Sequence, residues 1–227
     1  MLDKIKGGLV VSCQALPNEP LHSPKIMGRM AVAAQEGGAL GIRANSVEDI
    51  KEIKKHVNLP IVGIIKKDFD NCEIYITPTK DEVKELIDVS CDMIAIDATM
   101  RNRPNGDTLK ELVQLVHDHG KLAMADISTE EEALNAQKLN FDCVSTTLSG
   151  YTKYSPQIEG PDFKLVERLV DTMNIPVIAE GRIHSLLDAE KMSKLNPHAI
   201  VIGSAITRPQ IITNTYNKAI QAGKKIK

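Results

Sequence analysis

Short apolar runs, rich in β-branched residues, recur along the chain, and each is followed by a polar stretch and then by apolar residues at helical spacing. Leu109, Leu112, Val113 and Val116 show that spacing, which puts apolar side chains on one helix face. The pattern predicts eight strands, at residues 8–14, 40–44, 60–66, 93–97, 122–126, 143–147, 176–180 and 199–203. It also predicts eight helices, at residues 24–36, 47–57, 80–89, 109–119, 129–139, 162–173, 186–195 and 209–222.

Polar residues at the predicted helix starts agree with this division. Ser46, Thr79, Ser128 and Ser185 are each followed three residues later by Asp or Glu, which is the spacing of a capping box. Pro209 lies near the start of the last helix, where its missing N–H group has no cost.

The predicted strands are near-continuous apolar runs, such as Ile-Val-Gly-Ile-Ile at 61–65 and Ala-Ile-Val-Ile at 199–202. Strands of this kind are covered on both faces, and are therefore parallel and wrapped by helices. Eight strand–helix units in 227 residues predict a single-domain (β/α)8 TIM barrel over residues 1–227. An open doubly wound sheet is the alternative, but it would require a glycine-rich first turn, whereas Gln14 is followed by Ala-Leu-Pro.

Composition narrows the classes of function. A formal net charge of −2 and only 3% aromatic residues, with no Trp, disfavour nucleic-acid binding and aromatic carbohydrate-binding surfaces. There is no apolar run of about 18 residues and no signal-peptide pattern, so we expect no membrane span and a cytoplasmic protein. The four cysteines are scattered, without metal-ligand spacing, and we expect them to be buried in a reducing compartment.

The residues at the predicted strand ends are chemically functional types. In a barrel of this kind the chemistry lies at the C-terminal strand ends. Those ends carry Gln14, Arg43, Lys66, Asp97, Asp126, Thr147, Glu180 and Gly203. Because side chains two apart share a strand face, Lys66, Asp126 and Glu180 project into the barrel mouth if the apolar residues before them fill the interior. The opposite parity would instead turn inward Lys67, Ala125 and Ala179.

Each of these side chains also has a structural interpretation that the sequence leaves open. Lys66 could be a solvated residue that ends its strand, and Glu180 with Arg182 could be a surface ion pair of little energetic value. Asp126 could cap the following helix, and Arg43 could form a salt bridge at the barrel rim. The convergence of opposite charges from four strands on one rim favours a catalytic site.

Two glycine turns predict a phosphate site. Gly181 follows the seventh predicted strand, and Gly203 ends the eighth. Glycines let backbone N–H groups approach a ligand, and the loops after strands seven and eight are the usual phosphate site of such barrels. Two ordinary tight turns are the alternative. The six histidines mostly fall in predicted helices or loops, and this favours a mechanism without a metal.

Several segments resemble a known family. They are Gly8-Leu-Val-Val-Ser-Cys-Gln-Ala15, Asp97-Ala-Thr-Met-Arg-Asn-Arg-Pro104, Ala125-Asp-Ile-Ser-Thr129, Thr146-Thr-Leu-Ser-Gly-Tyr-Thr152, Glu180-Gly-Arg182 and Ile202-Gly-Ser-Ala-Ile-Thr-Arg-Pro209. The family is that of the N-acetylmannosamine-6-phosphate 2-epimerases. The Asp97–Pro104 segment is the specific one, whereas the two glycine turns are shared by many phosphate-binding barrels.

The resemblance implies a bacterial cytoplasmic enzyme of sialic-acid and amino-sugar catabolism that acts on a phosphosugar without a metal or redox cofactor. By position, it implies that Lys66 transfers the proton and that Glu180 is its acidic partner. It assigns sugar contacts to Gln14, Arg43 and Asp126, and phosphate contacts to Gly181, Arg182, Gly203, Ser204 and Arg208. It further implies a homodimer, for which the last predicted helix, 209–222, is our candidate interface.

Epimerisation next to a latent aldehyde requires an open-chain sugar, because only a carbonyl can delocalise the carbanion as an enolate. Burial would lower the pKa of Lys66, whereas the Glu180 carboxylate would raise it, so the pair is expected to titrate together. Arg43, Gln14 or Asp126 could then stabilise the enolate oxygen or the N-acetyl group. Two alternatives remain, namely a lyase or synthase in which Lys66 forms a Schiff base, and a non-catalytic phosphosugar sensor.

Overall fold

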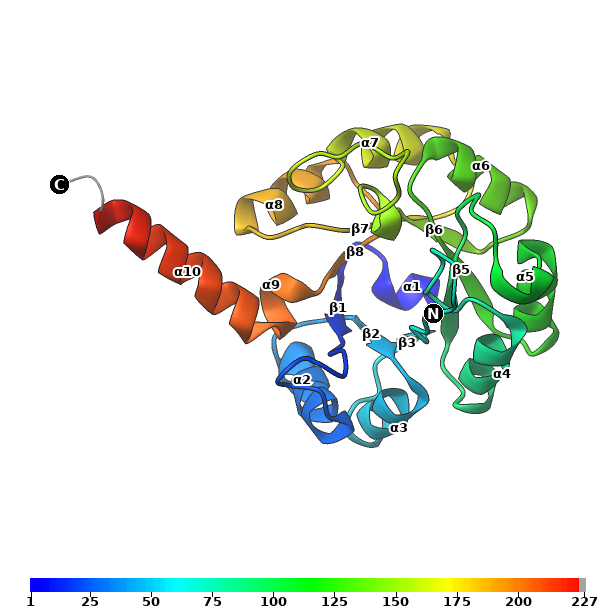
Figure 1. Ribbon diagram of the computed structural model, residues 1–227, viewed down its shortest axis with the longest axis horizontal. Helices are drawn as coiled ribbons and strands as arrows, with labels where there is room; N and C mark the ends of the chain where they lie inside the picture. Colours follow the sequence, from blue (N-terminus) through cyan, green and yellow to red (C-terminus); the bar gives the residue numbers. More distant parts are fainter. Residues whose placement is uncertain (225–227) are drawn as a thin grey trace.

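Eight parallel strands close into a barrel in chain order (Figure 1). The computed structural model describes residues 1–224, so residues 225–227 of the predicted domain lie outside the described part. The strands are β1 (Leu9–Cys13), β2 (Gly41–Asn45), β3 (Ile61–Ile64), β4 (Met93–Asp97), β5 (Leu122–Asp126), β6 (Cys143–Ser145), β7 (Val177–Glu180) and β8 (Ala199–Ile202). Because β8 pairs with β1, the (β/α)8 barrel is confirmed and the open sheet is excluded.

All eight predicted helices form, with small differences at their ends. They are α2 (Pro24–Glu36), α3 (Val47–His56), α4 (Lys80–Asp88), α5 (Leu109–Asp118), α6 (Glu130–Lys138), α7 (Phe163–Thr172), α8 (Leu186–Lys194) and α10 (Pro209–Lys224). The pattern did not predict the short helices α1 (Leu2–Ile5), η1 (Pro104–Gly106), η2 (Thr146–Leu148) and α9 (Ser204–Thr207). Three or four residues are too few to show a helical period.

The helix caps correct two of the four predicted capping boxes. Full capping boxes form at Thr79 and Ser185 as expected, whereas Ser46 supplies only the side-chain half of one. The box expected to start at Ser128 instead starts one residue later, at Thr129. Ser128 Oγ and N both bind the same carboxylate of Glu132, at 2.8 and 2.7 Å, and thus extend the cap backwards.

Apolar residues fill the barrel interior with the predicted parity. Val62, Ile64, Met124 and Ile178 are fully buried and belong to one inner cluster. Ile5 of α1 joins this cluster, so the short N-terminal helix contributes to the inner core. Ala125 lies in the cluster between strands and helices, and Ala179 in a separate outer cluster. The residues that continue the inner rows, Lys66, Asp126 and Glu180, therefore lie at the carboxyl end of the barrel.

The last helix departs from the ring of helices. Figure 1 shows α10 projecting away from the barrel, and none of its residues, 209–224, is buried. Ile211, Tyr216 and Ile220 are 39%, 70% and 57% exposed along it. Within the described residues, every helix is too short or too polar to cross a lipid bilayer.

Candidate functional site

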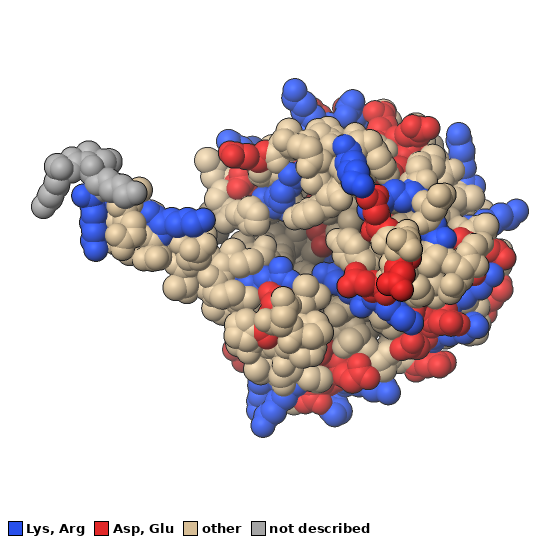
Figure 2. All heavy atoms as spheres, viewed as in Figure 1, with Lys and Arg blue, Asp and Glu red and all other residues tan. Residues whose placement is uncertain are grey.

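A cavity of about 700 Å³ opens at the carboxyl ends of the strands. Figure 2 shows the hollow near the middle of this face, with Lys or Arg side chains along its edge. Nine of the ten predicted site residues line it, namely Gln14, Arg43, Lys66, Glu180, Gly181, Arg182, Gly203, Ser204 and Arg208. The structure thus brings together residues from five strand ends of the barrel.

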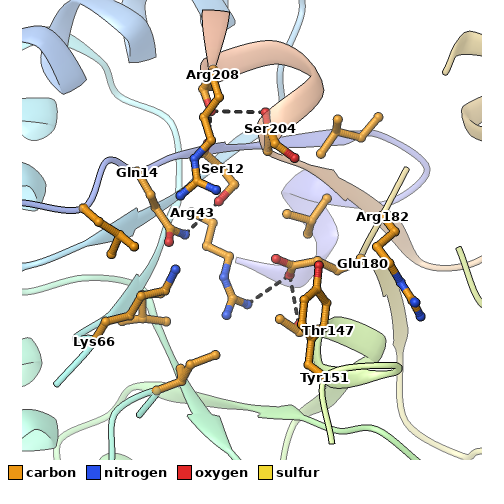
Figure 3. A pocket seen from close by; sticks show the side chains of 18 of the residues that line it. Ser12, Gln14, Arg43, Lys66, Thr147, Tyr151, Glu180, Arg182, Ser204 and Arg208 are labelled. Atoms are coloured by element: carbon orange, nitrogen blue, oxygen red, sulfur yellow. Dashed lines mark hydrogen bonds and ion pairs between the residues drawn. The ribbon is translucent and has the colours of Figure 1, made fainter. Parts of the chain in front are cut away.

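Arg43 forms the centre of a buried charge cluster. It lies on β2, is 1% exposed, and pairs with Asp126 through Nη2–Oδ2 at 2.5 Å and Nη1–Oδ1 at 3.1 Å. Its Nη1 also lies 3.1 Å from Glu180 Oε2 (Figure 3). Burial acts to lower the pKa of Arg43, but the carboxylates of Asp126 and Glu180 outweigh it and raise the pKa above its usual value. One guanidinium therefore holds two carboxylates from different strands.

Asp126 lies below the cavity rather than in its wall. It is fully buried, and its Oδ1 accepts a hydrogen bond of 2.7 Å from Thr147 Oγ1 in addition to the contacts with Arg43. The residues that line the cavity, all within the described chain, do not include it. Its observed role is to orient Arg43, and the predicted direct contact with the sugar stays a prediction.

Glu180 presents one carboxylate oxygen to protein partners. Arg43, Ser145 and Thr147 all contact Oε2, at 3.1, 3.3 and 3.1 Å. Among residues 1–224, no hydrogen bond is made to Oε1. Burial raises the pKa of Glu180, and the negative charge of Asp126 raises it further, against the opposing effect of Arg43. The net effect is a pKa for Glu180 above its usual value.

Lys66 follows β3, and its side chain lines the same cavity. Its pKa is lowered to about 8, first by burial and then by the positive charges of Arg43 and Arg208. Glu180 and Asp126 act in the opposite direction, so the predicted opposition of burial and carboxylate is confirmed, and burial prevails. In the described residues, no hydrogen bond or ion pair joins Lys66 Nζ to Glu180. Figure 3 shows the two side chains on opposite sides of Arg43.

The two glycine turns follow the neighbouring strands β7 and β8, and both line the cavity. Gly181 has a φ of +108° and Arg182 a φ of +55°, so two successive residues after β7 adopt left-handed backbone. Gly203 packs against β1, where an added Cβ would lie 3.2 Å from Ser12 Cβ, and it precedes the short helix α9. Successive left-handed or turn residues direct N–H groups into a concavity that suits an anion.

The side chains of the two predicted phosphate arginines differ in direction. Arg182 points away from the cavity centre in Figure 3, with Nη2 2.8 Å from Ser149 O and Nη1 on Ile158 O. Arg208 reaches the cavity from the junction of α9 and α10, and its Nη2 lies 2.9 Å from Glu19 Oε2. Arg208 therefore belongs to the cavity of its own chain, whereas the Arg182 guanidinium is held by two backbone carbonyls.

Comparison with known proteins agrees with these features. A family model described as "Putative N-acetylmannosamine-6-phosphate epimerase" matches residues 27–222. The chain belongs to this family. A Clostridioides difficile (strain 630) protein named "Putative N-acetylmannosamine-6-phosphate 2-epimerase" is 61% identical over 221 residues, which cover 97% of this chain and 99% of that protein.

Solved structures extend the likeness to three dimensions. A structure of the N-acetylmannosamine-6-phosphate 2-epimerase from Clostridium perfringens matches with a TM-score of 0.95 and 58% identity, covering 96% of each chain. A thiamine phosphate pyrophosphorylase from Pyrococcus furiosus matches with a TM-score of 0.62 at 17% identity, over 91% of this chain and 89% of that one. The second likeness shows a shared barrel fold only.

The predicted site omitted several residues that line the cavity in this epimerase-family chain. They include Ser12, Asp68, Tyr75 and Tyr151. Ser12 could have been found, because it lies two positions before Gln14 on the same strand face and accepts a 2.7 Å hydrogen bond from Gln14 Nε2. The other three lie in loops, where no period indicates the direction of a side chain.

Proposed function

We propose that the chain epimerises N-acetyl-D-mannosamine 6-phosphate to N-acetyl-D-glucosamine 6-phosphate at C2, by metal-independent proton abstraction and reprotonation. Family membership and the names of its relatives support this reaction. The observation that carries the mechanism is the placement of Lys66 and Glu180 on opposite sides of one cavity (Figure 3). Inversion at a carbon centre requires proton transfer on both of its faces, and two such groups can serve both.

The residues proposed to bind phosphate and those proposed to bind the sugar line different parts of the cavity, and this suggests how the substrate lies in it. Its phosphate would lie on the backbone of Gly181, Arg182, Gly203 and Ser204, with the Arg208 guanidinium as a charged partner. The sugar would then extend over Arg43 towards Gln14, with Asp126 acting on it through Arg43.

The proton transfer follows from the two pKa shifts. With its pKa near 8, Lys66 is neutral in about a tenth of molecules at pH 7, far more than an ordinary lysine. Neutral Lys66 Nζ takes the C2 proton of the open-chain sugar, and the electron pair moves into the C1 carbonyl to form an enolate. Protonated Glu180 then returns a proton to the opposite face of C2, and proton transfer from Lys66 to Glu180 restores the starting state.

Arg43 supplies the positive charge that this step needs. It is buried, held in place by Asp126, and adjacent to Glu180, so it requires little reorganisation as the enolate charge develops. Because the C1 carbonyl accepts the electron pair and Arg43 stabilises it, the proposed reaction uses neither a metal nor a redox cofactor.

The setting of the enzyme is part of the same proposal. We infer one cytoplasmic domain, acting in sialic-acid and amino-sugar catabolism on a soluble phosphosugar, without nucleic-acid or membrane partners. We also infer a homodimer that uses α10, because a second copy would cover Ile211, Tyr216 and Ile220 on a helix that the barrel leaves exposed. Sedimentation of the Tyr216→Glu, Ile220→Glu double variant should give a monomer where the native chain gives a dimer. A native chain that sediments as a monomer would refute this inference.

Proton NMR in D2O tests the reaction directly. We expect N-acetylmannosamine 6-phosphate to give N-acetylglucosamine 6-phosphate signals that lack the C2 proton, equally with and without EDTA. Loss of activity in EDTA would overturn the metal-free mechanism, and no reaction by folded protein would overturn the substrate assignment. Borohydride trapping with substrate separates the Schiff-base alternative, since only an imine on Lys66 would become a stable covalent adduct.

A further inference from the structure

The segment Asp97–Pro104, which begins at the end of β4, does not line the cavity. The lining residues, all within the described chain, include none from 97 to 104. Asp97 is fully buried at the end of β4, and its carboxylate accepts hydrogen bonds from Thr99 and Arg101. Its Oδ1 accepts from Thr99 N and Oγ1 at 3.0 and 2.7 Å. The buried carboxylate thus anchors the turn that follows β4.

Arg101 connects this segment to the loop between β3 and α4. Its Nη2 lies 2.7 Å from Asp97 Oδ2, and its Nε donates to Thr99 Oγ1 at 2.9 Å. The remaining arm, Nη1, donates to the backbone carbonyl of Glu73 at 3.1 Å. The Asp97 carboxylate thus orients the guanidinium through Nη2, and Nη1 binds the loop.

Arg103 holds the same loop at a second point. Its Nη1 donates to Pro78 O at 2.9 Å, and its Nη2 contacts the carbonyl of Asp97. The two arginines, which follow β4, therefore bind the two ends of one stretch of backbone, residues 73–78.

Residues 73–78 run antiparallel to the backbone at Lys66. Residues Lys66 and Ile76 form an antiparallel bridge, in which Lys67 N donates to Tyr75 O at 3.0 Å. On the other side of the bridge, Thr77 N donates to Ile65 O at 2.7 Å. Tyr75 and Ile76 also line the cavity. Any displacement of residues 73–78 would therefore shift Lys66 and open its surroundings to water.

We propose that Arg101 and Arg103 are positioning residues, which hold residues 73–78 against Lys66 and thereby fix its amine in the cavity. The inference rests on the proposed proton-transfer role of Lys66. It accounts for two arginines at this spacing, because each reaches a carbonyl at a different end of the stretch. Neither arginine is among the described residues that line the cavity.

The test compares Arg101→Gln with Lys153→Ala. Lys153 makes an ion pair with the side chain of Glu73, but it is 85% exposed and does not hold the backbone. For Arg101→Gln we expect kcat to fall by about a hundredfold, since small displacements of a reacting group have effects of that size. We expect inhibition by inorganic phosphate to stay within about twofold, because the phosphate end of the cavity is formed by other loops. Lys153→Ala should retain native kcat.

The pH profile separates positioning from a loss of stability. Water admitted around Lys66 would raise its pKa from about 8, so the rise of kcat/KM with pH should move upward in Arg101→Gln. A variant with native kcat and an unshifted profile, or one that weakens phosphate inhibition as much as kcat, would overturn the proposal. If Arg101→Gln does not fold, Arg101→Lys is used instead. The lysine keeps the positive charge beside Asp97 but has no guanidinium to bind the Glu73 carbonyl at the same time, and the same outcomes apply.

Lys66→Ala, measured in parallel, distinguishes this inference from the proposed function. If Lys66→Ala still exchanges the C2 proton, the proposed proton-transfer role of Lys66 fails and the inference fails with it. If Lys66→Ala is inactive while Arg101→Gln has the native rate, only the positioning role is refuted.

Discussion

Arg43 Nη1 and Glu180 Oε2 lie 3.1 Å apart, although their strands β2 and β7 are not neighbours in the barrel. The same guanidinium binds Asp126, so one positive charge faces two carboxylates in a buried space. When Lys66 is protonated the four groups are balanced, with two charges of each sign. When Lys66 is neutral, the excess negative charge favours a proton on Glu180, and this is how the two groups can exchange one proton.

Lys66→Ala should abolish exchange of the C2 proton with D2O while inorganic phosphate binding stays largely intact. The reason is that the lysine amine removes the proton, whereas the glycine turns hold the phosphate. NMR of the substrate in D2O and calorimetry with inorganic phosphate would measure the two effects. Equal loss of exchange and of phosphate binding would instead make Lys66 a phosphate anchor.

The pH dependence of kcat/KM should show a rise with its midpoint near pH 8. Lys66 acts as a base only when neutral, and its pKa is lowered to about 8, so activity increases as pH rises through that value. The Glu180 carboxylate raises the pKa of Lys66, so Glu180→Gln should move this rise to lower pH as well as reduce kcat. A profile identical to the native one would remove Glu180 from proton transfer.

Asp126→Ala should reduce both stability and activity. Removing it takes away two contacts from a guanidinium that is 1% exposed, and breaking a buried pair on one side costs about 3–5 kcal/mol in the free energy of unfolding. Urea denaturation would measure this loss. Lys194→Ala is the matched control, because it breaks the exposed pair with Glu190 and should change the stability little. An Asp126→Ala midpoint equal to that of the control would refute the assigned role.

Glu19→Ala should weaken binding of the phosphosugar without slowing the chemistry. Glu19 Oε2 accepts from Arg208 Nη2 at 2.9 Å and from Leu16 N at 2.7 Å, so it holds the arginine against the loop after β1. We expect KM for the phosphosugar to rise about tenfold with kcat unchanged, the signature of lost uniform binding. Residual activity on unphosphorylated N-acetylmannosamine should not change, and an equal loss on both sugars would contradict a role through the phosphate.

The sequence by itself determined the barrel and most of the residues that meet at its carboxyl end. Apolar runs without alternation required strands that are covered on both faces. Because side chains two positions apart share a strand face, Lys66 and Glu180 are expected on the same face as the buried residues Ile64 and Ile178. These are local regularities, so they can be read from one strand at a time. The one-residue error at the Thr129 cap arose because adjacent Ser and Thr residues offer equivalent hydroxyls.

Only the tertiary structure decided how the charges meet. Asp126 and Glu180 appear alike in the sequence, yet one lies below Arg43 and the other beside the cavity. Arg182 and Arg208 also appear alike, but the carbonyls of residues 149 and 158 turn the first away, while Glu19 holds the second at the cavity. The position of a charged side chain depends on partners distant along the chain, and the hydrophobic period carries no information about them.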